Sequence, residues 1–278
     1  MPVSTETAKP EDKGGPDLKA RPKIDVRDLR FAVEDREILK GITLTIQPGE
    51  VLCVMGLSGS GKSTLTRCIA GLVRPTGGQL LIDGEDTVPM PESELLRVRA
   101  KIGVVFQYAA LFDSMNVADN IAFGILRGPR REENRKMGRI ALERRVVELL
   151  NAVGLPGIGK RMPSELSGGM RRRVGLARAL ATKPEIILYD EPTSGLDPVT
   201  AAAIDQLILS TRAEQKATSV VVSHDMGSIY RIADKILMIY EGRAQVYGTP
   251  QEIQETDDPI VRQFTRGEVD GPINARRR

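Results

Sequence analysis

The stretch Gly56-Leu57-Ser58-Gly59-Ser60-Gly61-Lys62-Ser63-Thr64 follows an apolar run that ends at Met55 and opens a segment with helical spacing. It fits the pattern G-x-x-x-x-G-K-[ST], in which glycines let successive backbone N–H groups turn toward a polyphosphate. The helix adds its N-terminal N–H groups, Lys62 adds a positive charge, and the Ser63 hydroxyl can ligate Mg²⁺. The sequence therefore predicts a phosphate site formed by Gly56, Ser58, Gly59, Ser60, Gly61, Lys62, Ser63 and Thr64.

Apolar runs of strand length recur along the chain and alternate with helical segments. They lie at residues 50–55, 102–106, 185–189, 219–222 and 236–239. Runs of this kind indicate strands buried on both faces, as in a parallel sheet covered by helices. The segments 24–31 and 42–46 instead alternate apolar and polar residues, as half-buried strands do, and a further strand is expected at 79–83.

A mostly helical block from about Val117 to Leu180 interrupts this alternation, and we expect it to form a separate lobe. Within it, residues 139–153 are predicted to form a helix. Its apolar face is expected to comprise Ile140, Val146, Val147, Leu149, Leu150 and Val153.

The composition excludes several classes of protein. A hydrophobic content of 41% with 28% charged residues fits a soluble domain with a full core. The net charge of +3 and the absence of Trp give no reason to expect nucleic acid as a partner. Cys53 and Cys68 are expected in the core, and a single histidine, His224, excludes a Cys/His metal cluster. No secretion pattern or apolar run of about 18 residues is present, so we expect a cytoplasmic chain that meets a membrane only through a partner.

A second group of candidate residues follows the apolar run 186–189. Asp190 and Glu191 stand at the carboxyl end of this expected strand, the edge at which open α/β sheets bind ligands. Asp190 is placed to hold Mg²⁺ through water, and Glu191 to orient and deprotonate an attacking water.

Leu166-Ser167-Gly168-Gly169-Met170 and the following residues 171–180 resemble the signature motif and helix of ABC ATPases. Gln107, the run Ser194-Gly195-Leu196-Asp197, and His224 match further motifs in the same order, and the resemblance covers about residues 24–247. It implies an α/β P-loop NTPase: an ABC ATPase core with a mostly parallel sheet, an N-terminal antiparallel β subdomain and an inserted helical subdomain. The expected divisions are a disordered tail at 1–22, an ATPase domain at 23–267 with its helical subdomain at about 108–181, and a flexible tail at 268–278.

The resemblance also implies the cofactors ATP and Mg²⁺ and a set of roles. Ser167, Gly168 and Gly169 begin a helix, whose N–H groups favour anions. In the family this end meets the γ-phosphate held by the opposite subunit, so a head-to-tail dimer of this chain is expected. Gln107 would contact Mg²⁺ and the attacking water, His224 the γ-phosphate, and Asp197 the dimer interface.

Two positions depart from the family pattern. Val33 stands where most members place an aromatic residue over adenine, with Phe31 close by, so weak selectivity for ATP over GTP is expected. The signature ends in Met170, where the family usually has Gln. The side chain at this position does not contact phosphate, so hydrolysis is expected to be retained. The arginines that follow Met170 are interpreted as packing residues.

The finer resemblance is to the ATPases of bacterial MCE-associated (Mla-like) lipid transport systems, through residues 106–117, 163–170 and 258–264. It implies an inner-membrane permease, an MCE lipid-binding protein and phospholipid or related cargo, with this chain on the cytoplasmic side. Residues 108–116 would dock the permease, although their apolar members also suit a lobe core. Two alternatives stay open: an ABC ATPase for a small solute, and a soluble ABC protein without a membrane partner.

Overall fold

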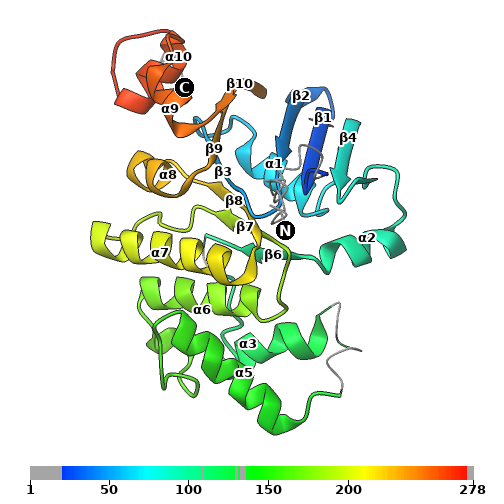
Figure 1. Ribbon diagram of the computed structural model, residues 1–278, viewed down its shortest axis with the longest axis vertical. Helices are drawn as coiled ribbons and strands as arrows, with labels where there is room; N and C mark the ends of the chain where they lie inside the picture. The colour runs from blue at the N-terminus through cyan, green and yellow to red at the C-terminus, as the bar shows by residue number, and fades with distance from the viewer. Residues whose placement is uncertain (1–20, 108, 129–130, 132–135, 274–278) are drawn as a thin grey trace, which may run out of the picture.

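The computed structural model describes residues 21–107, 109–128, 131 and 136–273 (Figure 1). Its centre is a six-stranded sheet in the order β10-β9-β3-β8-β7-β6, in which only β10 runs antiparallel to its neighbour. The strands are β3 (Val51–Met55), β6 (Ile102–Val105), β7 (Ile186–Asp190), β8 (Thr218–Val222), β9 (Lys235–Tyr240) and β10 (Arg243–Gly248). The predicted mostly parallel sheet is confirmed.

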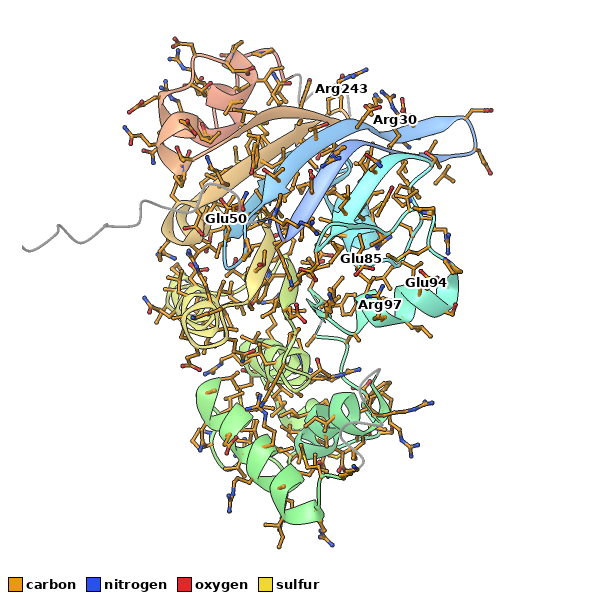
Figure 2. All side chains as sticks on the ribbon, turned by 45° about the vertical axis from the view of Figure 1, so that its right-hand side comes forward. Arg30, Glu50, Glu85, Glu94, Arg97 and Arg243 are labelled. Carbon is orange, nitrogen blue, oxygen red and sulfur yellow. The ribbon has the colours of Figure 1, made fainter. Side chains whose placement is uncertain are left out.

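A four-stranded antiparallel sheet in the order β2-β1-β4-β5 forms the expected N-terminal β subdomain. It comprises β1 (Ile24–Val33), β2 (Arg36–Ile46), β4 (Gly77–Ile82) and β5 (Glu85–Asp86). β1 and β2 pair from Ile24↔Ile46 to Val33↔Arg36, with register shifts along the way, so both strands are longer than expected. Helix α2 (Glu92–Arg99) has no counterpart among the expected elements, and Arg97 fixes it to β5 through Glu85 (Figure 2).

Helices cover both faces of the parallel sheet. Alternate strand residues face opposite sides: Leu52 and Val54 of β3 pack with α1 (Lys62–Ile69), whereas Cys53 and Met55 pack into the other core. That second core is covered by α6 (Gly168–Leu180), α7 (Pro198–Gln215) and α8 (Met226–Ile232). The helix that follows the phosphate loop and the helix of the signature motif therefore lie on opposite faces of the sheet. Cys53 and Cys68 are both buried and free, as predicted.

The helical lobe contains α3 (Val117–Arg127), α5 (Arg139–Ala152), the short 3₁₀ helix η1 (Pro163–Glu165) and α6. The predicted apolar face of α5 is partly wrong. Val146, Leu149 and Leu150 are buried, but Ile140 and Val147 are 76% and 56% exposed. These two residues are seven positions apart and so share one side of the helix, which is turned away from α3 and α6.

The last two helices of the described residues are α9 (Pro250–Glu255) and α10 (Pro259–Arg266). Residues 268–273, placed by the sequence in a flexible tail, fold back onto α10. The buried Gln263 side chain accepts from the Ile273 N–H at 2.7 Å and donates to the carbonyls of Glu268, Val269 and Ile273. Residues 1–20 and 274–278, in which the remaining parts of both predicted tails fall, lie outside the described residues, as does Tyr108.

Candidate active site

Every candidate catalytic residue follows a strand of the parallel sheet. The phosphate loop follows β3, His224 follows β8, Glu191 follows β7, and Gln107 follows β6. These strands are consecutive neighbours and all parallel, so their carboxyl ends meet at one edge. The sheet topology thus gathers residues that are spread over more than a hundred positions of the sequence.

Glycine is required in the phosphate loop by both conformation and space. Gly56, Gly59 and Gly61 have φ angles of 140°, 76° and 109°, a range that residues with a Cβ atom rarely adopt. A Cβ at Gly56 would lie 2.2 Å from the carbonyl oxygen of Ile239 in β9, and one at Gly61 2.8 Å from Leu39 Cδ2 in β2. The loop is therefore held between the parallel sheet and the β subdomain.

Lys62 occupies the first turn of α1 and bends back over the loop. Its Nζ donates to the carbonyl oxygens of Gly56 and Leu57 at 2.7 and 2.8 Å. Burial lowers the pKa of Lys62, opposed by the charges of Glu191 and Asp190. A partly desolvated ammonium is poorly compensated by two carbonyls, so an incoming polyphosphate would be a better partner.

Glu191 and His224 are in direct contact. His224 Nδ1 lies 2.7 Å from Glu191 Oε2, close enough for an ion pair with a protonated imidazole, although the two atoms are not aligned as a hydrogen bond. The Glu191 N–H donates to the Val222 carbonyl at 2.9 Å, which fixes the residue to β8. Glu191 also has a φ of 50°, a left-handed backbone conformation that non-glycine residues adopt less readily.

The donor set at this edge fits Mg²⁺. Ser63, Asp190 and Gln107 offer a hydroxyl, a carboxylate and an amide oxygen, the kinds of ligand that Mg²⁺ prefers. Burial raises the pKa of Asp190, against the opposing charges of Arg67 and Lys62, so a further cation beside it would relieve an uncompensated carboxylate. Within the described ranges no group of three His, Cys, Asp or Glu residues could hold a metal alone. Phosphate oxygens would have to complete the coordination.

The signature residues belong to a second group, on the other face of the sheet. Ser167 caps α6, and its Oγ accepts from the Met170 N–H at 3.2 Å. Gly168 and Gly169 form the first turn, and a Cβ at Gly169 would lie 3.1 Å from Thr200 Cγ2 at the start of α7. Asp197 caps α7 by accepting from the N–H groups of Val199 and Thr200. The signature and the Asp197 turn therefore form one continuous surface.

The loop after Gln107 is tied to the signature helix by arginines. Arg172 Nε donates to the Gln107 carbonyl at 3.2 Å, and Arg178 Nη1 donates to the Ala110 carbonyl at 2.6 Å. The Arg178 guanidinium also lies 4.6 Å from the ring centroid of Phe112. Arg172, one of the three arginines directly after Met170, thus contacts the backbone as a packing residue does, and Arg178 packs in the same way against a carbonyl and a ring.

Asn120 was not singled out in the sequence, yet it organises this same loop from α3. Its fully buried side chain accepts from the Phe112 N–H at 2.8 Å and donates toward the carbonyls of Phe112, Met115 and Asn116. The available signal was a polar residue inside an otherwise apolar helical face. A hollow of about 410 Å³ lies between this loop, the start of α6 and the Asp197 turn.

The fold and this arrangement of loops define a nucleotide-hydrolysing cassette, and the chain belongs to the ABC transporter family, whose profile matches residues 39–194. The Escherichia coli (strain K12) intermembrane phospholipid transport system ATP-binding protein MlaF is 42% identical over 90% of this chain and 91% of its own. The Mycobacterium leprae protein named "Probable ribonucleotide transport ATP-binding protein mkl" is 42% identical over 90% of this chain and 70% of its own.

A solved dimeric structure of the ATP-binding cassette MJ0796, in a post-hydrolysis state bound to ADP and Pi, superposes with a TM-score of 0.73. It is 32% identical and covers 81% of this chain and 98% of its own. The chain is thus an ATP-binding and ATP-hydrolysing subunit of the ABC class. In the part of the chain that the structure describes, no helix has the length and apolar character to cross a membrane.

Proposed function

We propose that this chain powers the movement of phospholipid, or a related lipid, through a partner permease. The observation that carries the ATPase part is the convergence of Lys62, Asp190, Glu191 and His224 at one edge of the parallel sheet. The lipid part is supported by the identity to the MlaF protein, which extends over nine-tenths of both chains.

Each candidate residue has a distinct task in this proposal. Lys62 and the N–H groups of residues 56–64 bind the ATP phosphates, and Glu191 orients and deprotonates the attacking water. His224, which contacts Glu191 at 2.7 Å, interacts with the γ-phosphate. Ser63, Asp190 and Gln107 hold Mg²⁺, which neutralises charge on the phosphates when it is bound.

The complete site requires a second copy of the chain. The Lys62 helix and the Ser167 helix lie on opposite faces of the sheet, so Ser167, Gly168 and Gly169 are presented away from the phosphate loop of their own chain. In a head-to-tail pair each signature meets the γ-phosphate on the other subunit, and Asp197 lies at the same interface. Two ATP molecules then stabilise the closed pair.

The surface around the 410 Å³ hollow is our candidate for permease docking. Leu111 lines it, while Phe112, on the same loop, is 37% exposed and is held by Arg178 and Asn120. Closure of the pair would move this loop together with the helical lobe. We assign the lobe to about residues 108–181, within an ATPase domain that spans residues 23–267. We place the chain at the cytoplasmic side of the inner membrane, with an MCE lipid-binding protein as a further partner.

Size-exclusion chromatography of a Glu191→Gln variant with ATP and Mg²⁺ tests the ATPase and dimer assignments. The variant should bind ATP, elute as a dimer and lack turnover, whereas a Glu255→Gln control, changed on the exposed side of α9, should hydrolyse ATP normally. Wild-type turnover by Glu191→Gln would refute the base assignment, and a strict monomer would refute the pairing.

The cargo is tested by purifying the membrane complex and identifying bound lipid by mass spectrometry. Stimulation of ATPase activity by phospholipid, but not by ribonucleotide, is the expected result. Because the mycobacterial relative is named for ribonucleotide transport, ribonucleotide is the alternative cargo to compare. Stimulation by ribonucleotide alone would replace lipid with that small solute.

A further inference from the structure

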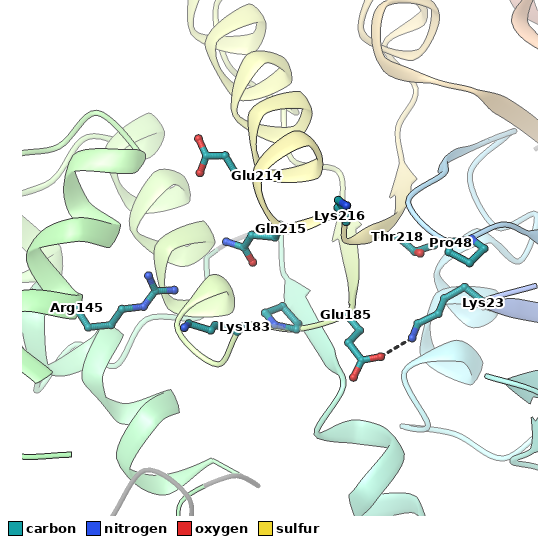
Figure 3. Close-up of a pocket in the computed structure, with 10 residues that line it drawn as sticks. Lys23, Pro48, Arg145, Lys183, Glu185, Glu214, Gln215, Lys216 and Thr218 are labelled. Atoms are coloured by element: carbon teal, nitrogen blue, oxygen red, sulfur yellow. Dashed lines mark hydrogen bonds and ion pairs between the residues drawn. The ribbon is translucent and has the colours of Figure 1, made fainter. Parts of the chain in front are cut away.

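A second hollow, of about 540 Å³, lies at the opposite edge of the parallel sheet from the phosphate loop (Figure 3). Glu185 and Thr218, at the amino ends of β7 and β8, form part of its wall. Arg145 of α5 closes one side, and Lys183 and Gln215 come from the segments that end α6 and α7. The hollow therefore lies at the joint between the helical lobe and the core, and its volume is in the range of ligand pockets.

The two ends of this hollow differ in how their charges are paired. Lys23 is neutralised at one end, where its Nζ contacts Asp83 at 2.7 Å and Glu185 at 2.5 Å. At the other end, Arg145 has only a 3.6 Å contact with Glu148, and no ion pair to Lys183 is found among the described residues. The Arg145 side chain is only 23% exposed, so its charge is partly desolvated. A partly desolvated guanidinium with a weak partner favours an anion.

Two buried polar atoms in this wall lack a hydrogen-bond partner in the described part of the chain. They are Arg145 Nε and Gln215 Oε1. Figure 3 shows the Arg145 and Gln215 side chains pointing toward each other, with Lys183 beside them and no bond between them. The Nε edge of a guanidinium can donate two parallel hydrogen bonds to an oxyanion. Gln215 offers an amide donor and the unpaired acceptor Oε1 to the same space.

We infer that this end of the hollow binds a phosphate group, held by Arg145, Lys183 and Gln215. Phosphate matches the donors and the acceptor because its protonated anions carry several acceptor oxygens and at least one P–OH donor, which can reach Gln215 Oε1. A carboxylate or sulfate leaves that oxygen unpaired. The bound group joins α5 of the helical lobe to the core, so its presence restricts movement of the lobe. The inference does not depend on the cargo.

The phosphate loop also binds phosphate, so the test uses the full-length Lys62→Ala protein, in which that site is disabled. Isothermal titration with inorganic phosphate at pH 6.5 should show saturable binding. Arg145→Gln and Lys183→Gln, each added to this background, should weaken it at least tenfold. Arg144→Gln, which changes the exposed neighbouring arginine of α5, should leave it unchanged. Sulfate should bind several-fold more weakly than phosphate.

A second titration, with dihexanoyl phosphatidic acid below its micelle concentration, identifies the source of the phosphate. Binding of this lipid with the same dependence on Arg145 makes a lipid headgroup the ligand, and binding of inorganic phosphate alone makes free phosphate the ligand. The inference is overturned if neither compound binds saturably. It is also overturned if Arg144→Gln weakens binding as much as Arg145→Gln does.

Discussion

Replacing Asn120 by Ala should loosen the loop that joins the proposed Mg²⁺-binding edge to the proposed permease surface. The Asn120 side chain is fully buried and is the main polar anchor of residues 112–116 on α3. Alanine removes the acceptor for the Phe112 N–H and the donor shared by three carbonyls. Asn116 provides a matched control: it is less buried, and its side chain makes one capping bond, accepting from the Asp119 N–H at 2.8 Å.

The two substitutions differ in expected magnitude. Each lost hydrogen bond costs about 1 kcal/mol net, and a buried group left unpaired costs about 1–3 kcal/mol. Asn120→Ala loses at least one hydrogen bond that the side chain accepts and one that it donates. We therefore expect a loss of about 2–4 kcal/mol in the free energy of unfolding. Asn116→Ala loses one helix cap, which costs about 1 kcal/mol.

Urea unfolding and ATPase assays of both variants, with and without the permease, test this reasoning. Asn120→Ala should unfold at the lower urea concentration and lose most permease-stimulated turnover, while basal hydrolysis falls less because the phosphate loop is untouched. Asn116→Ala should keep its stimulation. Equal stability of the two variants, or full stimulation of Asn120→Ala, would show that the Asn120 network does not hold the loop.

Val33→Tyr introduces an aromatic ring at the position expected to lie over adenine, and stacking contributes about 0.5–1.5 kcal/mol. ATP should therefore bind several-fold more tightly in a titration with a fluorescent nucleotide. Unchanged affinity would place the adenine elsewhere. The ion pairs with Lys101 and Lys23 outweigh burial and hold the pKa of Asp83 below its ordinary value. The stabilisation from these ion pairs is present above about pH 4 and is lost as pH falls through the lowered pKa. In Asp83→Asn, the free energy of unfolding measured in urea should therefore fall less steeply at acid pH than in the wild type. An unchanged pH dependence would contradict this. Leu150→Ala should cost about 2–5 kcal/mol and Ile140→Ala less than about 0.5 kcal/mol in the same assay, and similar losses would contradict the orientation of α5.

The residues that meet at the carboxyl edge of the parallel sheet could be selected from the sequence, because they lie in short motifs whose residue types suit phosphate and Mg²⁺ binding. The phosphate loop needs glycines and a lysine, and Asp190 and Glu191 follow a short apolar run rich in isoleucine and leucine, whose length suits a buried strand. The structure adds that Phe31 packs into the core beneath the β subdomain while Val33 is 51% exposed. That orientation leaves Val33, and not Phe31, available to a base.

Other features depend on contacts that no local pattern contains. Helix α2 buries only Leu95 and Val98 among charged residues, so its apolar periodicity is weak. Ile140 and Val147 fit an apolar helix as well as Val146 does, and only the position of α3 and α6 decides which residues are covered. The Asn120 network likewise joins backbone groups whose positions are set by the tertiary fold.

The location of Lys62 and Ser167 on opposite faces of one sheet has a genetic consequence. In the proposed head-to-tail pair, a Lys62→Ala copy and a Ser167→Ala copy place both defects in the same composite site, and the second site is wild type. A cell that expresses the two alleles together therefore retains mixed pairs with one working centre, while either allele alone leaves none. Recessive defects in this chain should accordingly fall into two complementation groups within a single gene.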